Sequence, residues 1–118
     1  MSAYAAADLI PTGPEPPVKV RAVLSLRTED NGGRRTGIRS GYRPNHNFGD
    51  SDNRRFYVGQ VNFGNTELIN PGESREVLIE FLRGPGLTEV LKVGVTWRIQ
   101  EGPKFVATAR VLEVLDGT

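Results

Sequence analysis

The sequence has 118 residues, of which 37% are hydrophobic and 25% charged, values that predict one small globular domain with a single core. Its net charge of +1 at neutral pH excludes a strong overall field for binding nucleic acid. Since it contains no cysteine, disulfide scaffolds, thiolate metal sites and cysteine nucleophiles are excluded.

The chain is expected to begin with a flexible tail. Residues 1–17 are rich in alanine and proline, and four prolines, at positions 11, 14, 16 and 17, prevent a continuous helix. We therefore expect the domain proper to cover residues 18–118. No segment is long and apolar enough to span a bilayer, and no secretory signal is visible, so we expect a cytoplasmic protein that does not contact a membrane.

The rest of the chain has the pattern of β-strands. Hydrophobic and polar residues alternate over 18–27 and again over 104–111, where Phe105, Ala107, Ala109 and Val111 form the expected inward face. The predicted strands cover 18–27, 37–42, 56–63, 75–82, 92–100 and 104–115. Turns are predicted at 29–33, 70–74 and 101–103, where glycine and proline gather. Six short strands without a helical period indicate an all-β barrel or sandwich.

A glycine pair in "NGGRRTG", which starts at Asn31, raises the question of a phosphate-binding loop. The stretch has no Lys-Ser/Thr pair and no following helix, so nucleotide binding is not expected. A hairpin turn is the better interpretation, because Gly32 and Gly33 allow positive φ.

Side chains that could perform catalysis or bind a metal are few. His46 is the only histidine, so neither a zinc site nor a Ser-His-Asp triad is expected, and we expect His46 to lie on a surface loop. The acidic pairs Glu29–Asp30 and Asp50–Asp52 lack the distal glutamate of a calcium loop and are expected in solvated loops. We therefore predict a protein that is not an enzyme and has no cofactor or metal.

Arginines are concentrated in the first half of the domain. Positions 27, 34, 35, 39, 43, 54 and 55 are arginine, against acids only at 29, 30, 50 and 52. Several arginines adjoin aromatic residues, as on RNA-binding surfaces where arginine contacts phosphate and rings stack on bases. The alternative is that the rings fill the core and the arginines extend into solvent.

Three stretches of the chain are informative together: "TEDNGGRRTGIRSGYRP", "INPGESREVLIEFL" and "WRIQEGPKFVATARVLEVL". They resemble motifs in the C-terminal domain of translation elongation factor Tu. The first is similar to that family's acidic-Gly-Gly-Arg-His-Thr and Gly-Tyr-Arg-Pro stretch, the second to its Pro-Gly-Asp/Glu turn and strand, and the third to its last hairpin. The resemblance spans residues 18–115 and implies a six-stranded antiparallel β-barrel. Because the GTP-binding and second domains are missing, it implies a free-standing relative of that domain.

The resemblance also implies where binding would occur. In the family this domain contacts the T-stem backbone of tRNA, the GTPase domain and the nucleotide-exchange factor. Transferred by motif, the candidate residues are Arg34, Arg35, Arg43, Asn45, Arg83, Glu101 and Gly102. Arg35 replaces the family's histidine and Asn45 its glutamine.

Two hypotheses follow for the function. The first is a non-enzymatic module that binds a protein, either a translation factor or a factor or toxin that recognises one. The second is binding of tRNA or another RNA backbone through the edge formed by Arg34, Arg35 and Arg43. The near-zero net charge favours the protein.

Overall fold

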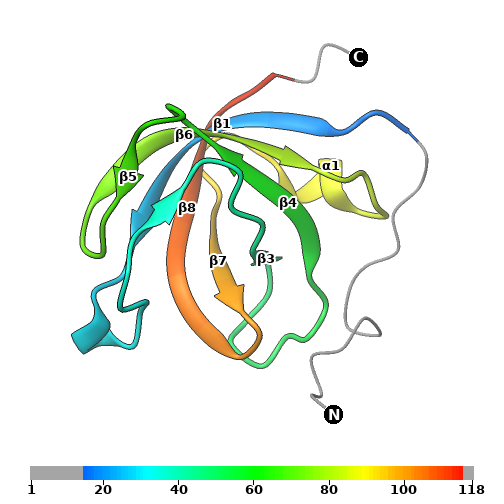
Figure 1. Ribbon diagram of the computed structural model, residues 1–118. Helices are drawn as coiled ribbons and strands as arrows, with labels where there is room; N and C mark the ends of the chain where they lie inside the picture. The colour runs from blue at the N-terminus through cyan, green and yellow to red at the C-terminus, as the bar shows by residue number, and fades with distance from the viewer. Residues whose placement is uncertain (1–14, 116–118) are drawn as a thin grey trace.

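The protein is a closed β-barrel in the computed structural model, which describes residues 15–115 (Figure 1). Its strands follow the order β1-β6-β4-β3-β7-β8, and every neighbouring pair is antiparallel. They are β1 (Val18–Leu26), β3 (Asn45–Asn47), β4 (Tyr57–Asn62), β6 (Ser74–Phe81), β7 (Thr96–Glu101) and β8 (Lys104–Val114). The predicted all-β fold with a six-stranded antiparallel barrel is confirmed.

Four short elements lie outside the barrel. Strand β2 (Ile38–Arg39) pairs with β5 (Leu68–Ile69) as a separate two-stranded sheet. A 3₁₀ turn, η2 (Glu29–Asn31), follows β1, and a one-turn helix, α1 (Leu87–Val90), follows β6. Ile38, Ile69 and Leu87 are all buried, so β2, β5 and α1 add apolar side chains to the core.

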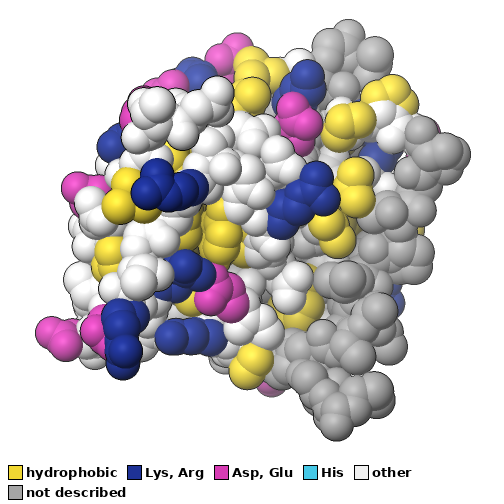
Figure 2. Space-filling view, viewed as in Figure 1, with side chains coloured by type: hydrophobic (Ala, Val, Ile, Leu, Met, Phe, Trp, Pro, Cys, Tyr) yellow, Lys and Arg dark blue, Asp and Glu magenta, His cyan; other side chains and the backbone are white. Residues whose placement is uncertain are grey.

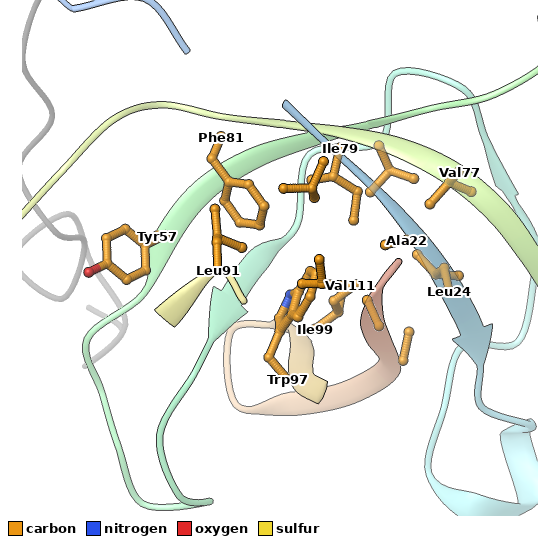
Figure 3. Close-up of a cluster of buried hydrophobic side chains, with 14 of the residues drawn as sticks. Ala22, Leu24, Tyr57, Val77, Ile79, Phe81, Leu91, Trp97, Ile99 and Val111 are labelled. Atoms are coloured by element: carbon orange, nitrogen blue, oxygen red, sulfur yellow. The ribbon is translucent and has the colours of Figure 1, made fainter. Parts of the chain in front are cut away.

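Alternating side chains of the long strands fill the barrel. Val20, Ala22 and Leu24 of β1 are fully buried, and β6 places Val77, Ile79 and Phe81 beside them (Figure 3). Each large aliphatic side chain removed from water in this way contributes roughly 1.5–3 kcal/mol to the hydrophobic stabilisation. Trp97, Ile99 and Val111 complete the interior from β7 and β8, as Figure 3 shows.

The predicted strand at 37–42 is only partly correct. Ile38 and Arg39 do form a strand, but it pairs with β5 and does not belong to the barrel. The barrel is completed instead by β3, the polar triplet Asn-His-Asn, which hydrogen-bonds to β4 and β7. The sequence pattern missed this strand because its buried positions carry polar side chains.

Two strand boundaries differ from the prediction for physical reasons. Strand β7 begins at Thr96 and not at residue 92, because residues 92–95 form a turn in which Gly94 has a φ of +89°. The pairing of β7 with β8 shifts register between Ile99 and Gln100. As a result Val106 and Ala107 are both buried and Phe105 is only half-buried, so the predicted inward position of Phe105 is wrong.

The glycine pair does not form the predicted hairpin. Strand β1 pairs with β6 and β8, so the turn after it connects strands that are not partners. Gly32 does have a positive φ of +89°, whereas Gly33 is needed for space, since a Cβ there would lie 2.4 Å from the Arg27 carbonyl oxygen.

Candidate functional site

Three motif residues that are distant in sequence meet in one cluster. Arg34 lies in the loop before β2, Tyr42 lies before β3, and Glu101 ends β7. An ion pair joins Arg34 to Glu101, and the Tyr42 hydroxyl donates a hydrogen bond to the same Glu101 oxygen. The Arg34 guanidinium carbon lies 5.4 Å from the centroid of the Tyr42 ring. We call these residues the Arg34 cluster; they connect two loops to the last hairpin of the barrel.

The guanidinium group of Arg34 is largely satisfied within the protein. Its Nε donates to the Thr36 carbonyl at 3.2 Å, and its Nη2 lies 3.2 Å from the Thr36 hydroxyl oxygen. The side chain is only 25% exposed. Burial and the hydrogen bond to Glu101 raise the pKa of Tyr42, so its hydroxyl stays protonated and continues to donate. Arg34 therefore acts first as a structural residue.

Arg35, the next residue, is in the opposite situation. Its side chain is 83% exposed and makes only a surface ion pair with Glu29, at 3.2 Å. Such pairs contribute little to stability because water screens them. Arg35 is thus free to exchange Glu29 for a group on a partner.

Arg43 and Asn45 lie beside the Arg34 cluster. Arg43 is exposed and donates from Nε to the Gln60 amide oxygen on β4, at 2.7 Å. Asn45 is half-buried in β3, between Val58 of β4 and Gln100 of β7. Arg43 also lines a shallow surface pocket, together with Pro17, Val58, Gly59, Gln60, Glu80 and Leu82.

Gly102 and Arg83 are the remaining candidate residues. Gly102 has a φ of +59° in the β7–β8 turn, and its carbonyl accepts a hydrogen bond from Gln100 at 3.1 Å. Arg83 follows β6 and donates to the Pro16 carbonyl at 3.1 Å, away from the Arg34 cluster. The candidates therefore form a band across β7, β3, β4 and β6.

The charge on the surface is mixed. Figure 2 shows Lys and Arg side chains separated by acidic and uncharged ones on the face that it presents. Within the Arg34 cluster, Glu101 balances the charge of Arg34. The candidate arginines therefore do not act as one concentrated positive charge.

His46 is a buried residue, contrary to the prediction that it lies on the surface. It is 0% exposed: Trp97 donates from Nε1 to its Nδ1 at 3.0 Å, and its Nε2 donates to the Gly59 carbonyl at 3.1 Å. Burial lowers its pKa to about 4. A Cβ on Gly59 would lie 2.9 Å from Nε2, so this glycine makes room for the ring.

Asn47, the other buried polar residue of β3, was also missed. Its amide nitrogen donates to Gln100 Oε1 at 2.7 Å, and its oxygen accepts from Asn53 at 2.7 Å and from the Gly49 N–H at 2.9 Å. Asn47 thus organises the loop after β3 and connects it to the β7–β8 hairpin. No local signal in the sequence distinguishes it from the exposed asparagines.

The sequence matches no protein-family model. Over residues 15–115, no three His, Asp or Glu side chains are grouped so that they could bind a metal ion. The same part of the chain has no helix of the length and hydrophobicity needed to cross a bilayer.

Proposed function

We propose that this chain is a non-enzymatic module that binds a protein in a translation-linked setting, as its resemblance to the C-terminal domain of elongation factor Tu implies. The closed antiparallel barrel agrees with that resemblance. So does the Arg34 cluster, because Arg34, Tyr42 and Glu101 come from three separate parts of the resembling motifs and contact one another.

The ion pair between Arg34 and Glu101 is the main observation that favours a protein partner over RNA. Binding an RNA backbone requires several cations that are free to neutralise phosphates. Here the central arginine of the motif is already neutralised, and the net charge of the chain is +1. Protein surfaces bind instead through mixed polar and apolar contacts.

The surface pocket beside Arg43 offers contacts of that mixed kind. Leu82 is 46% exposed and lines the pocket with Pro17 and Val58, while Arg43 supplies a cation at the same place. Arginine next to apolar side chains is common in protein interfaces. We propose that the docking surface lies here, between β4 and β6.

The proposal can be tested with two purified proteins that contact the related domain. The chain is immobilised, and the GTPase domain of elongation factor Tu and its nucleotide-exchange factor are titrated separately. We expect one of them to bind with a Kd below about 100 µM. Arg43→Glu should weaken this binding about tenfold or more, while Lys92→Glu, the same charge reversal at an exposed position outside the pocket, should not. Failure of both proteins to bind would overturn the proposal.

Binding of an RNA backbone is the second candidate. It is favoured by the exposure of Arg35 and by the partner of Arg43, a neutral amide that leaves its charge uncompensated. On this hypothesis the Arg34, Arg35 and Arg43 edge would contact tRNA, and Arg35→Ala combined with Arg43→Ala would abolish binding at low salt.

A further inference from the structure

A second group of arginines lies on the outer surface of β1, β8 and β7, which are neighbours in the barrel (Figure 1). Its members are Arg27, which follows β1, Arg98 of β7 and Arg110 of β8. Arg98 is half-buried opposite Thr108 of β8, and Arg110 is exposed opposite Thr96 of β7. Arg98 and Arg110 are therefore diagonal neighbours on the outer face of the β7–β8 pair.

The half-buried ring of Phe105 holds two of these arginines in place. The guanidinium carbon of Arg27 lies over the ring, 4.1 Å from its centroid, and that of Arg98 also lies over it, at 4.7 Å. Arg27 is fixed further because its Nη1 donates to the Phe105 carbonyl at 3.1 Å. A guanidinium group held over a ring keeps N–H groups at its edge for other acceptors.

The arginines of this surface are not neutralised by the rest of the protein. Among residues 15–115, none of Arg27, Arg98 and Arg110 forms an ion pair with a carboxylate. The acids of β7 and β8 are engaged elsewhere, since Glu101 pairs with Arg34 and Glu113 pairs with Arg21 at 3.2 Å. Glu76 of the neighbouring strand β6 also pairs with Arg21, at 3.2 Å. The neighbouring polar side chains are hydroxyls, which add donors without adding negative charge: Ser25, Ser74, Thr96 and Thr108.

We propose that this surface, which we call the Phe105 surface, binds an acidic segment of a protein, with carboxylates paired to Arg27, Arg98 and Arg110. This goes beyond the proposed function, whose docking surface lies between β4 and β6, because it assigns a second surface and the chemistry of its ligand. Arginine suits the role because its fork of donors binds a carboxylate through two hydrogen bonds.

The two guanidinium groups that cover the Phe105 ring favour a protein over a nucleic acid as the ligand. Proteins that bind single-stranded nucleic acids offer open aromatic faces on which bases stack. Phe105 already has two guanidinium groups over it, so a base would have to displace an arginine of this chain. The cations are also few, and the chain as a whole is close to neutral.

The test uses a labelled peptide of Asp, Glu and Gly, with the matching Asn, Gln and Gly peptide as the neutral control. Fluorescence anisotropy at about 50 mM salt is measured for the full chain and for Arg98→Gln. The control variant is Arg55→Gln, which removes the same charge just before β4, across the barrel from β8. We expect saturable binding of the acidic peptide only, weakened about 5- to 10-fold by Arg98→Gln and unchanged by Arg55→Gln.

A second variant tests the role of the ring without changing the charge. Phe105→Leu keeps the position apolar but removes the surface on which Arg27 and Arg98 lie, so we expect about threefold weaker binding of the acidic peptide. Circular dichroism before each titration shows whether the variants are folded, and Arg98→Lys, which retains the charge, should bind better than Arg98→Gln.

Several results would overturn the inference. The first is that the acidic peptide does not bind. The second is that Arg55→Gln and Arg98→Gln lose the same amount of affinity for the peptide. The third is that tRNA binds more tightly than the peptide and that this binding depends on Arg98. Because the peptide does not depend on the identity of the natural partner, the two proposals fail separately. If the peptide binds and both translation proteins fail, the proposed function is wrong and the anion-binding surface stands; the reverse result overturns the Phe105 surface alone.

Discussion

Lowering the pH from 7 to 5 is expected to destabilise the barrel through one buried side chain, His46. The Trp97 N–H points at Nδ1 from 3.0 Å, and Nε2 donates to the Gly59 carbonyl. Both contacts fit the neutral ring with its proton on Nε2. A second proton would place an N–H on Nδ1, facing the N–H of Trp97, in a site without water contact.

The size of the effect follows from proton linkage. Burial lowers the pKa of His46 in the folded state to about 4, against about 6.5 when it is unfolded. Between these values the unfolded chain binds the proton and the folded chain does not. The stabilisation is therefore complete above pH 6.5 and is lost as the pH falls toward 4. It amounts to about 3 kcal/mol in total, of which about 2 kcal/mol is lost by pH 5.

Urea denaturation of the wild type and of His46→Gln, at pH 7 and pH 5, measures this loss. Glutamine offers one acceptor and one donor group but does not titrate in this range. We expect the variant to be less stable at pH 7 but to change little between the two pH values. The carboxylates are the same in both proteins, so the difference isolates His46. An equal loss of stability in both proteins would show that His46 does not cause the pH dependence.

Three further predictions concern the contacts around the site. Glu101→Gln should reduce the free energy of unfolding by about 1 kcal/mol and increase proteolysis of the 32–37 loop, because it weakens the ion pair with Arg34; unchanged digestion would contradict this. Asn47→Ala should lower the free energy of unfolding, measured by urea denaturation, by about 2 kcal/mol. Asn45→Ala, a half-buried control in the same strand, should lower it much less, and similar losses in the two variants would refute the assigned role of Asn47. Gly59→Ala should lower the free energy of unfolding by about 1–3 kcal/mol by crowding His46, and an unchanged unfolding curve would show that the ring can move aside.

The sequence predicted those parts of the barrel in which burial follows a simple alternation. Strands β1 and β6 carry apolar residues at every second position, and their predicted ranges differ from the observed ones by a single residue at the ends. Strand β3 could not be found in this way. Its buried positions are His46 and Asn47. Their hydrogen bonds to Trp97, Gly59 and Gln100 join residues that are distant in sequence.

The motifs select candidate residues, but they do not show how these residues pair. Motif positions indicated Arg34 and Glu101, and both lie in one cluster, yet nothing local shows that the two charges neutralise each other. The Phe105 surface could not be predicted from the sequence, for another reason. The register shift between β7 and β8 places Phe105 outside the alternation of its own strand, and such a shift is a property of the paired strands.

A titration of labelled tRNA with the chain at about 50 mM salt distinguishes a module that binds protein from one that binds RNA. Fluorescence anisotropy should show no saturable binding below about 10 µM, because Glu101 neutralises Arg34 and the net charge is +1. Saturable binding that weakens steeply with added salt, and that disappears in the variant carrying Arg35→Ala and Arg43→Ala, would show that the module binds RNA.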